Sequence, residues 1–147
     1  MSHVAMSEKI QISDQPDDAI VASVIEGLAD FNASEVGFAH KTALIVKLVT
    51  LDGKTLRAGL VGYTAWRWLF IEKLWIAAEL RGSGRAEKLL AAAESEAVGR
   101  GCNRAWLDTF NPNAKILYER LGYEVFGELP DFVASRSRYF LKKPLVE

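Results

Sequence analysis

A short glycine-rich segment carries the strongest chemical signal in the sequence. Residues 81–86 read Arg-Gly-Ser-Gly-Arg-Ala and lie between an apolar stretch that ends at Ile76 and a helix-forming run that starts at Ala86. Without Cβ atoms, the backbone N–H groups of such a loop can converge on an anion, and the following helix adds partial positive charge. Arg81 and Arg85 add full charges. The pattern suits a diphosphate, but a tight turn with solvated arginines would look the same.

Two other phosphate-binding motifs do not fit this segment. A P-loop needs a glycine, four residues and then Gly-Lys-Ser/Thr, and the sequence has no such run. A dinucleotide-binding loop needs a third glycine three residues after Gly84, where the sequence has Glu87. Taken alone, the segment therefore predicts an anion site without identifying the ligand.

Composition narrows the class of chemistry. The chain has 147 residues, 50% of them hydrophobic, which suits one domain with one core. A net charge of -1 favours neither nucleic acid nor an anionic membrane as a partner. Cys102 is the only cysteine and there are 2 histidines, so we expect no metal site and no histidine-based triad. The lone cysteine, the polar N-terminus and the absence of a long apolar run predict a cytoplasmic protein.

The first part of the chain must supply the elements that precede the loop. We expect a loose tail over residues 1–8 and a short strand over 9–13. Pro16 and the two aspartates after it predict a helix start, and the apolar residues that follow recur at helical spacing to Phe31. Three strands over 44–51, 56–66 and 69–76 then form an antiparallel meander across residues 42–76. Asp52-Gly53 predicts a two-residue hairpin turn with both residues at positive φ.

The second part places the loop between parallel strands. We expect a helix from Ala86, a strand over 104–109, a helix that starts at Asn111 and closing strands over 123–127 and 139–141. The strand–loop–helix–strand unit should be a parallel crossover. The predicted fold class is therefore α/β (α+β), with a mixed, mostly antiparallel sheet of six to seven strands flanked by helices. Residues 9–147 are expected to form a single domain.

The loop and a downstream segment together resemble the GNAT superfamily of N-acetyltransferases. The loop is similar to the family's acetyl-CoA signature, Gln/Arg-x-x-Gly-x-Gly/Ala, through Arg81, Gly84 and Ala86. Residues 111–123 are similar to its second motif, Asn-x-x-Ala-x-x-x-Tyr-x-x-x-Gly-Phe/Tyr. Arg85 departs from the pattern, which more often has an aliphatic residue there. The two motifs stand in the family's order and spacing, so the resemblance implies a small, bacterial-type, single-domain GNAT fold with acetyl-CoA as cosubstrate.

The resemblance also implies which residues contact acetyl-CoA. The backbone of Trp75, Ile76 and Ala77 would pair with the pantetheine arm like an extra strand, and Asn111 would contact the same arm. The pyrophosphate would be held by the backbone amides of Arg81, Gly82, Ser83, Gly84, Arg85 and Ala86. Asn111 is also a good helix N-cap by itself, and that role needs no ligand.

Direct acetyl transfer to an amine, through a ternary complex, needs groups that move protons. The second motif places Tyr118 near the thioester sulfur, where its hydroxyl would act as general acid, although a buried core tyrosine would show the same spacing. Glu72 lies inside an apolar strand, and burial there would raise its pKa and favour a role as general base. A solvated or ion-paired Glu72 is the alternative interpretation, and Asp108 is the second candidate base.

The amine acceptor is where the sequence leaves alternatives open. A small-molecule amine and a peptide amine both remain, because the sequence has no strong acidic patch that would favour one of them. Trp66, Trp68 and Trp75 would form either an acceptor wall or contacts of the core or of a homodimer. A non-catalytic CoA-binding or regulatory module of the same fold is the alternative to an enzyme.

Overall fold

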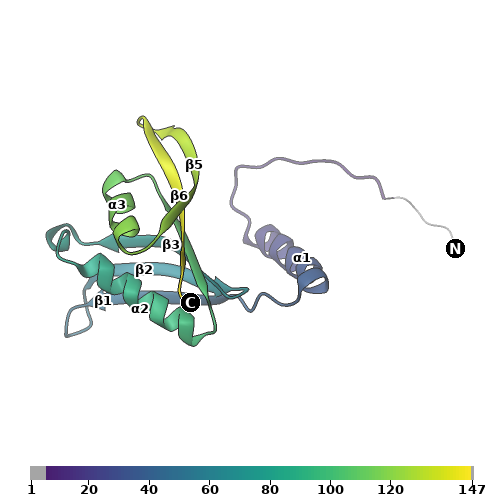
Figure 1. Ribbon diagram of the computed structural model, residues 1–147. Helices are drawn as coiled ribbons and strands as arrows, with labels where there is room; N and C mark the ends of the chain where they lie inside the picture. The colour runs from purple at the N-terminus through teal and green to yellow at the C-terminus, as the bar shows by residue number, and fades with distance from the viewer. Residues whose placement is uncertain (1–5, 147) are drawn as a thin grey trace. The chain divides into compact units, whose positions relative to one another are not determined.

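The computed structural model describes residues 6–146 of the 147-residue chain. The chain divides after Phe38 into two compact units, which we describe separately. The first contains α1 (Asp18–Val36), and the second contains the sheet and the other helices, as Figure 1 shows. Among the described residues, no helix is both long enough and apolar enough to span a membrane.

The first unit confirms the predicted helix and contradicts the predicted strand before it. The N-cap of α1 is Asp17, whose Oδ1 accepts a hydrogen bond from the Ile20 amide at 3.1 Å. The helix ends at Val36, and Gly37 caps its C-terminus with a φ of 86°. Residues 9–13 form no strand, because two alternating isoleucines without a paired neighbour do not make one. Residues 6–8 also lack regular structure, and residues 1–5 of the predicted tail lie outside the described range.

The second unit is built on a six-stranded sheet in the order β1-β2-β3-β4-β6-β5. Only the β3–β4 pair is parallel, which confirms the predicted crossover and the mixed, mostly antiparallel sheet. The strands are β1 (Thr42–Val49), β2 (Leu56–Ala65), β3 (Trp68–Ile76), β4 (Arg104–Thr109), β5 (Glu124–Val133) and β6 (Arg136–Pro144). A short 3-10 turn, Ala78–Leu80, leads from β3 into the glycine loop.

The turns of the meander differ from the prediction. Residues 50–55 connect β1 to β2, and of the Asp52-Gly53 pair only Gly53 has a positive φ, at 74°. The Asp52 carboxylate instead accepts hydrogen bonds from the Thr50 hydroxyl and the Lys54 amide, which stabilises a wider loop. The tight two-residue turn lies between β2 and β3, where Trp66 and Arg67 have φ values of 47° and 67°.

A bulge in β3 is the feature that shapes the site. Val61 of β2 pairs with Lys73, whereas the next residue, Gly62, pairs with Ile71, so Glu72 is the extra residue. A Cβ atom on Gly62 would overlap the Phe70 carbonyl oxygen, so this glycine allows the two backbones to approach closely. The bulge also shifts the alternation, because Leu69 and Ile71 face the core before it and Leu74 and Ile76 face the core after it.

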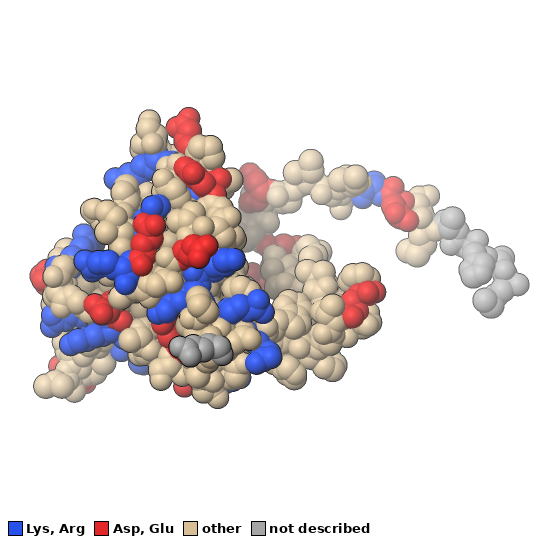
Figure 2. All heavy atoms as spheres, in the orientation of Figure 1, with Lys and Arg blue, Asp and Glu red and all other residues tan. Residues whose placement is uncertain are grey.

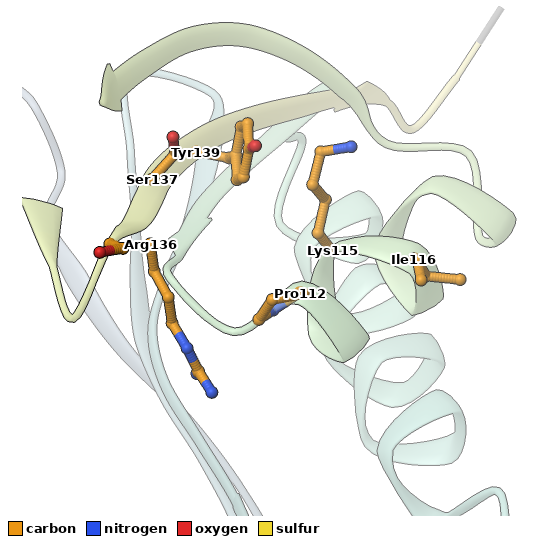
Figure 3. A pocket seen from close by; sticks show the side chains of 7 residues that line it. Pro112, Lys115, Ile116, Arg136, Ser137 and Tyr139 are labelled. Carbon is orange, nitrogen blue, oxygen red and sulfur yellow. The ribbon is translucent and has the colours of Figure 1, made fainter. Parts of the chain in front are cut away.

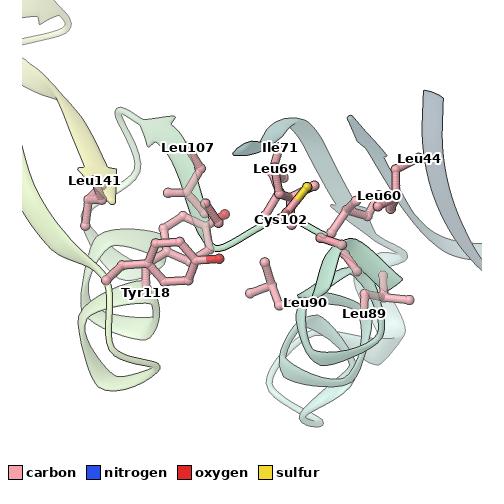
Figure 4. Packing of buried hydrophobic residues seen from close by; sticks show 14 of the residues in the cluster. Leu44, Leu60, Leu69, Ile71, Leu89, Leu90, Cys102, Leu107, Tyr118 and Leu141 are labelled. Atoms are coloured by element: carbon pink, nitrogen blue, oxygen red, sulfur yellow. The ribbon is translucent and has the colours of Figure 1, made fainter. Parts of the chain in front are cut away.

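Two helices pack on one face of the sheet. Figure 1 shows α2 (Arg85–Gly99) lying across β1 to β3, and α3 (Pro112–Arg120) contacts β4, β5 and β6. Figure 4 shows the core between them, in which leucines of the strands meet Leu89 and Leu90 of α2 and Tyr118 of α3. The fully buried large side chains are Leu44, Leu60, Leu69, Leu90, Leu107 and Leu141. Figure 2 shows acidic and basic side chains interspersed on the outer surface.

Candidate active site

The two parallel strands separate where the site begins. β3 and β4 pair only from Trp68 with Arg104 to Ile71 with Leu107. β3 continues to Ile76 without a partner on that side, and its bulge lies directly after the last pair. The separation leaves alternate backbone N–H and C=O groups of β3 unpaired by any strand, which is the condition for an extended ligand to add to the sheet.

A carboxylate follows the last pair on each strand. Glu72 is the next residue of β3, and Asp108 is the next residue of β4. Phe70 precedes Glu72 by two residues on β3, and Trp106 precedes Asp108 by two residues on β4. These two rings stack with centroids 4.0 Å apart, on the sheet face opposite the core leucines. Strand alternation places Asp108 on that same face. Both residues named as candidate bases therefore flank the opening.

The environment of Glu72 differs from the prediction. Its side chain is exposed instead of buried in an apolar strand, because the bulge turns it away from the core. Among the described residues it has no hydrogen-bond or ion-pair partner. The burial that was expected to activate it is therefore absent, and Glu72 is a solvated carboxylate beside the opening.

Asp108 is held firmly by a residue that the motifs do not contain. Its Oδ1 accepts hydrogen bonds from Arg138 Nε at 2.9 Å and from Arg138 Nη2 at 2.6 Å. The Asp108 side chain is 17% exposed. Arg138 itself lies over the rings of Phe132 and Phe140, at 5.2 and 5.4 Å from their centroids. The pair is long-range in sequence, so no local spacing signals it.

Tyr118, the predicted general acid, is a buried residue of α3. Only 7% of it is exposed, and it projects from α3 into the core (Figure 4). Burial raises the pKa of its hydroxyl above the ordinary tyrosine value, and the negative charge of Asp108 raises that pKa further. The hydroxyl is therefore protonated at neutral pH and lies within electrostatic reach of Asp108.

A polar network fixes the surroundings of Tyr118. The Tyr123 hydroxyl donates to Glu94 Oε2 at 3.0 Å, and Lys143 Nζ contacts Glu94 Oε1 at 2.6 Å. Burial and the Glu94 charge raise the pKa of Tyr123 far above its ordinary value. The rings of Tyr118 and Tyr123 lie 6.0 Å apart. Because Glu94 is on α2 and Lys143 on β6, the network connects α2 to the sheet and to the segment between α3 and β5.

The glycine loop ends in a helix start without a capping side chain. Gly84 is the N-cap of α2, with a φ of 80°, and it offers no side-chain acceptor to the first turn. A Cβ atom on Gly82 or Gly84 would meet nothing within 4 Å, so space is open in front of the loop. The Ser83 hydroxyl donates to the Leu80 carbonyl and stabilises the turn. The first-turn amides of α2 are therefore available to an anion.

The end of β3 presents fewer free backbone groups than the resemblance implies. The Ala77 amide donates to the Arg57 carbonyl at 2.9 Å, within the β2 side of the sheet. Alternation then directs the backbone groups of Ile76, and not those of Trp75, to the open edge. The Ile76 carbonyl accepts a hydrogen bond from Arg81 Nε at 3.2 Å. Arg81 thus connects the loop to the strand end.

Asn111 caps α3. Its Oδ1 accepts from the Asn113 amide at 2.9 Å and from the Ala114 amide at 3.5 Å, and Pro112 occupies the first turn. The capping role predicted from sequence is thus confirmed. The three tryptophans do not form one wall, because Trp66 lies in the β2–β3 turn, Trp68 lies under Arg104, and Trp75 lies at the far end of β3.

A pocket of about 380 Å³ lies beside the carboxyl end of β4. Figure 3 shows Lys115 and Ile116 of α3 on one side and the start of β6 on the other. Its two cations are Lys115, which pairs with Glu119 at 2.9 Å, and Arg136. Within residues 6–146 no group of three or more His, Cys, Asp or Glu side chains is arranged to hold a metal ion.

Comparison with known proteins decides the family. Residues 14–123 match the sequence profile described as "Acetyltransferase (GNAT) family". The chain belongs to this family. Acetyltransferase Atu2258 of Agrobacterium fabrum is 36% identical to it over 132 residues, which cover 90% of this chain and 96% of the relative. The chain is therefore a GNAT acetyltransferase, and the resemblance seen in the two motifs is confirmed.

Structures and a second relative agree with the GNAT assignment. The crystal structure of an Agrobacterium tumefaciens protein described as a candidate acetyltransferase matches with a TM-score of 0.88 at 35% identity, covering 93% of this chain and 99% of that one. Blasticidin-S acetyltransferase of Streptomyces morookaense is 35% identical over 91 residues, or 61% of this chain and 67% of the relative. Nourseothricin acetyltransferase matches with a TM-score of 0.61 at 27% identity, covering 70% and 65%.

Proposed function

We propose that this GNAT acetyltransferase moves an acetyl group from acetyl-CoA directly to a small-molecule primary amine, through a ternary complex. The observation that carries the proposal is the separation of β3 from β4, together with a buried Tyr118 whose pKa the Asp108 charge helps to raise and an uncapped helix start after β3. The open strand edge and the helix start would hold acetyl-CoA, and a proton donor would serve the departing thiolate.

The chain's own groups fit acetyl-CoA. The amides of the first turn of α2 and of residues 82–84 would hold the pyrophosphate, since the loop has open space and no competing cap. The backbone N–H and C=O groups of Ile76, which point to the open edge, would form hydrogen bonds with the pantetheine arm. The Ile76 carbonyl already accepts a hydrogen bond from Arg81 Nε and has a second lone pair for the ligand. Arg81 and Arg85 add attraction at longer range. Binding should therefore depend on the backbone conformation of the loop more than on its arginines.

The proton transfers can be assigned to two side chains. The amine nitrogen bonds to the acetyl carbonyl carbon, and the bond from that carbon to sulfur breaks. The attacking nitrogen loses one proton, which Glu72 accepts through a water molecule, because this solvated carboxylate has no partner among the described residues. The departing thiolate gains one proton from the Tyr118 hydroxyl, whose raised pKa keeps it protonated until that step. Solvent then restores both groups.

The relatives support a small-molecule acceptor. Blasticidin-S acetyltransferase and nourseothricin acetyltransferase are each named for a small antibiotic. The acetyl-transfer proposal is tested by mixing the protein with acetyl-CoA and a panel of amines, amino acids, aminoglycosides and peptides, and by recording release of the free thiol. We expect at least one small amine to give turnover, and acetyl-CoA alone to raise the melting temperature. The absence of both effects would exclude the assignment.

A further inference from the structure

The residues beyond the last β3–β4 pair form a connected cluster at the opening, which we call the acceptor cluster: Asp108, Phe110, Phe132 and Arg138. Arg138 bonds Asp108 and lies 5.2 Å from the Phe132 ring centroid. Phe132 in turn stacks against Phe110 at 5.8 Å, with an interplanar angle of 28°. The four side chains come from β4, the segment after it, β5 and β6, so they converge only in the folded sheet.

One oxygen of this cluster is available to a ligand. Both hydrogen bonds from Arg138 go to Asp108 Oδ1, and Oδ2 has no hydrogen-bond partner in the described part of the chain. The Asp108 side chain is mostly buried, so a donor that reaches Oδ2 would meet it in a poorly hydrated setting. Because the Arg138 guanidinium balances the charge of the Asp108 carboxylate, the pair as a whole attracts an ammonium ion only weakly. It accepts an N–H group of a neutral amine, which is the form that attacks the thioester.

The two phenylalanines give the cluster an apolar platform. Phe110 is 47% exposed and Phe132 is 42% exposed, although they stack on each other. The two rings form a small exposed aromatic patch next to a partly buried ion pair, and clustered apolar surface of this kind can mark a ligand contact. A flat apolar group could lie on these rings while an attached amine reaches Asp108.

The position of the cluster matches the chemistry. Asp108 directly follows the last β3–β4 pair, and its charge acts on the buried Tyr118 hydroxyl. A nitrogen bonded to Asp108 Oδ2 would therefore lie directly beyond the last β3–β4 pair, where the strand edge proposed for the cofactor arm begins. This inference rests on the proposed acetyl transfer and specifies its acceptor.

We propose that the acceptor cluster binds the amine substrate, with Asp108 Oδ2 accepting an N–H group and with Phe110 and Phe132 contacting a flat, apolar or aromatic body. The acceptor is thus a primary amine joined by a short linker to a ring. A small aliphatic amine or a peptide N-terminus would leave the aromatic platform unused.

The test uses two amines of similar basicity, phenethylamine and n-butylamine, at saturating acetyl-CoA. We expect KM to be roughly fivefold lower for phenethylamine, as an aromatic contact contributes on that scale. The double variant Phe110→Ala, Phe132→Ala should remove this difference. Phe126→Ala is the matched control, because Phe126 is also exposed on β5 but lies outside the cluster. Equal KM values in the wild type, or a preference that survives the double variant, would overturn the proposal.

Asp108→Asn tests the polar half of the cluster. We expect KM for phenethylamine to rise roughly tenfold or more, since a hydrogen bond to a charged group is lost. Acetyl-CoA affinity and melting temperature are measured on each variant, so that unfolding is recognised. Asp108→Glu, which keeps the charge, should recover part of the loss. An unchanged KM in folded Asp108→Asn would contradict the assignment of Oδ2.

The two proposals fail in different ways. If no amine is acetylated, binding of phenethylamine to the CoA-saturated protein is measured by titration calorimetry. Binding that weakens in the double variant would support the acceptor cluster even without turnover, and no binding to the wild type would overturn it. If an alanine tripeptide is acetylated with a higher kcat/KM than phenethylamine, the acceptor is a peptide and the inference is wrong while acetyl transfer stands.

Discussion

Each of the two parallel strands is followed by a helix, and the two helices begin in opposite ways. After β3, α2 starts at Gly84, which supplies no capping side chain. After β4, α3 starts at Asn111, whose side chain accepts hydrogen bonds from two amides of its own first turn. The amides of α2 are thus left for a ligand, whereas α3 satisfies its own and instead projects Tyr118 into the core. We propose that the start of α2 binds the pyrophosphate and that α3 positions Tyr118 for the reaction.

The largest effect should come from the side chain that α3 positions. We expect Tyr118→Phe to lower kcat by roughly 10²–10⁴-fold, because general acid catalysis typically contributes that much. The affinity for acetyl-CoA should be nearly unchanged, since the ring and its packing remain. Steady-state kinetics with a competent amine measures kcat, and thermal shift measures binding. An unchanged kcat, with chemistry shown to limit the rate, would remove Tyr118 from the reaction.

The next largest effect concerns the start of α2, which we propose binds acetyl-CoA. We expect Gly84→Glu to weaken acetyl-CoA binding by about a hundredfold or more, because it would place bulk and negative charge at the proposed pyrophosphate site, where the bonds involve a charged ligand. Gly53→Glu is a matched control, since Gly53 has a similar φ of 74° and open space around it. Dissociation constants from calorimetry compare the two. Equal losses in both variants would mean that backbone strain, and not the ligand site, is responsible.

A smaller effect should appear in the alkaline stability of the α3 region. The pKa of Tyr118 and that of Tyr123 are raised in the folded state, so the folded protein holds these protons more tightly than the unfolded chain. The stabilisation is complete below the unfolded tyrosine pKa of about 10 and is lost as the pH rises above it, by up to about 1.4 kcal/mol per pH unit for each group. Urea unfolding between pH 9 and pH 11 measures this slope. Tyr118→Phe should reduce it, and an unchanged slope would mean that Tyr118 ionises normally.

The smallest expected effect is a difference in the free energy of unfolding between variants of the two helix starts. We expect Asn111→Ala to lower the free energy of unfolding by about 1 kcal/mol through loss of the cap of α3. Gly84→Ala should destabilise mainly through its left-handed φ of 80°, because no cap is lost there. Chemical denaturation gives both values. If acetyl-CoA affinity falls more than tenfold in Asn111→Ala, this side chain also serves the ligand, as the family resemblance implies.

The sequence predicted what local spacing determines. The glycine loop, the start of α3 at Asn111 and the 104–109 strand are set by residues close together in the chain, and the structure has them where expected. The 9–13 strand was wrong because no segment of the described chain pairs with it, whereas residues 104–109 lie between β3 and β6. The Glu72 bulge and the Asp108–Arg138 pair were missed because both arise from register between strands, which alternation within one strand does not reveal.

Gly62 has a consequence for any attempt to redesign the enzyme. A side chain at this position would collide with the Phe70 backbone, and relieving the collision would move the two strands apart. A mutant library that seeks new acceptors should therefore vary Phe110 and Phe132, where exposed rings can be exchanged freely, and keep Gly62 constant. Diversity at Gly62 would mostly yield clones that lose the geometry of the opening before any new selectivity could be selected.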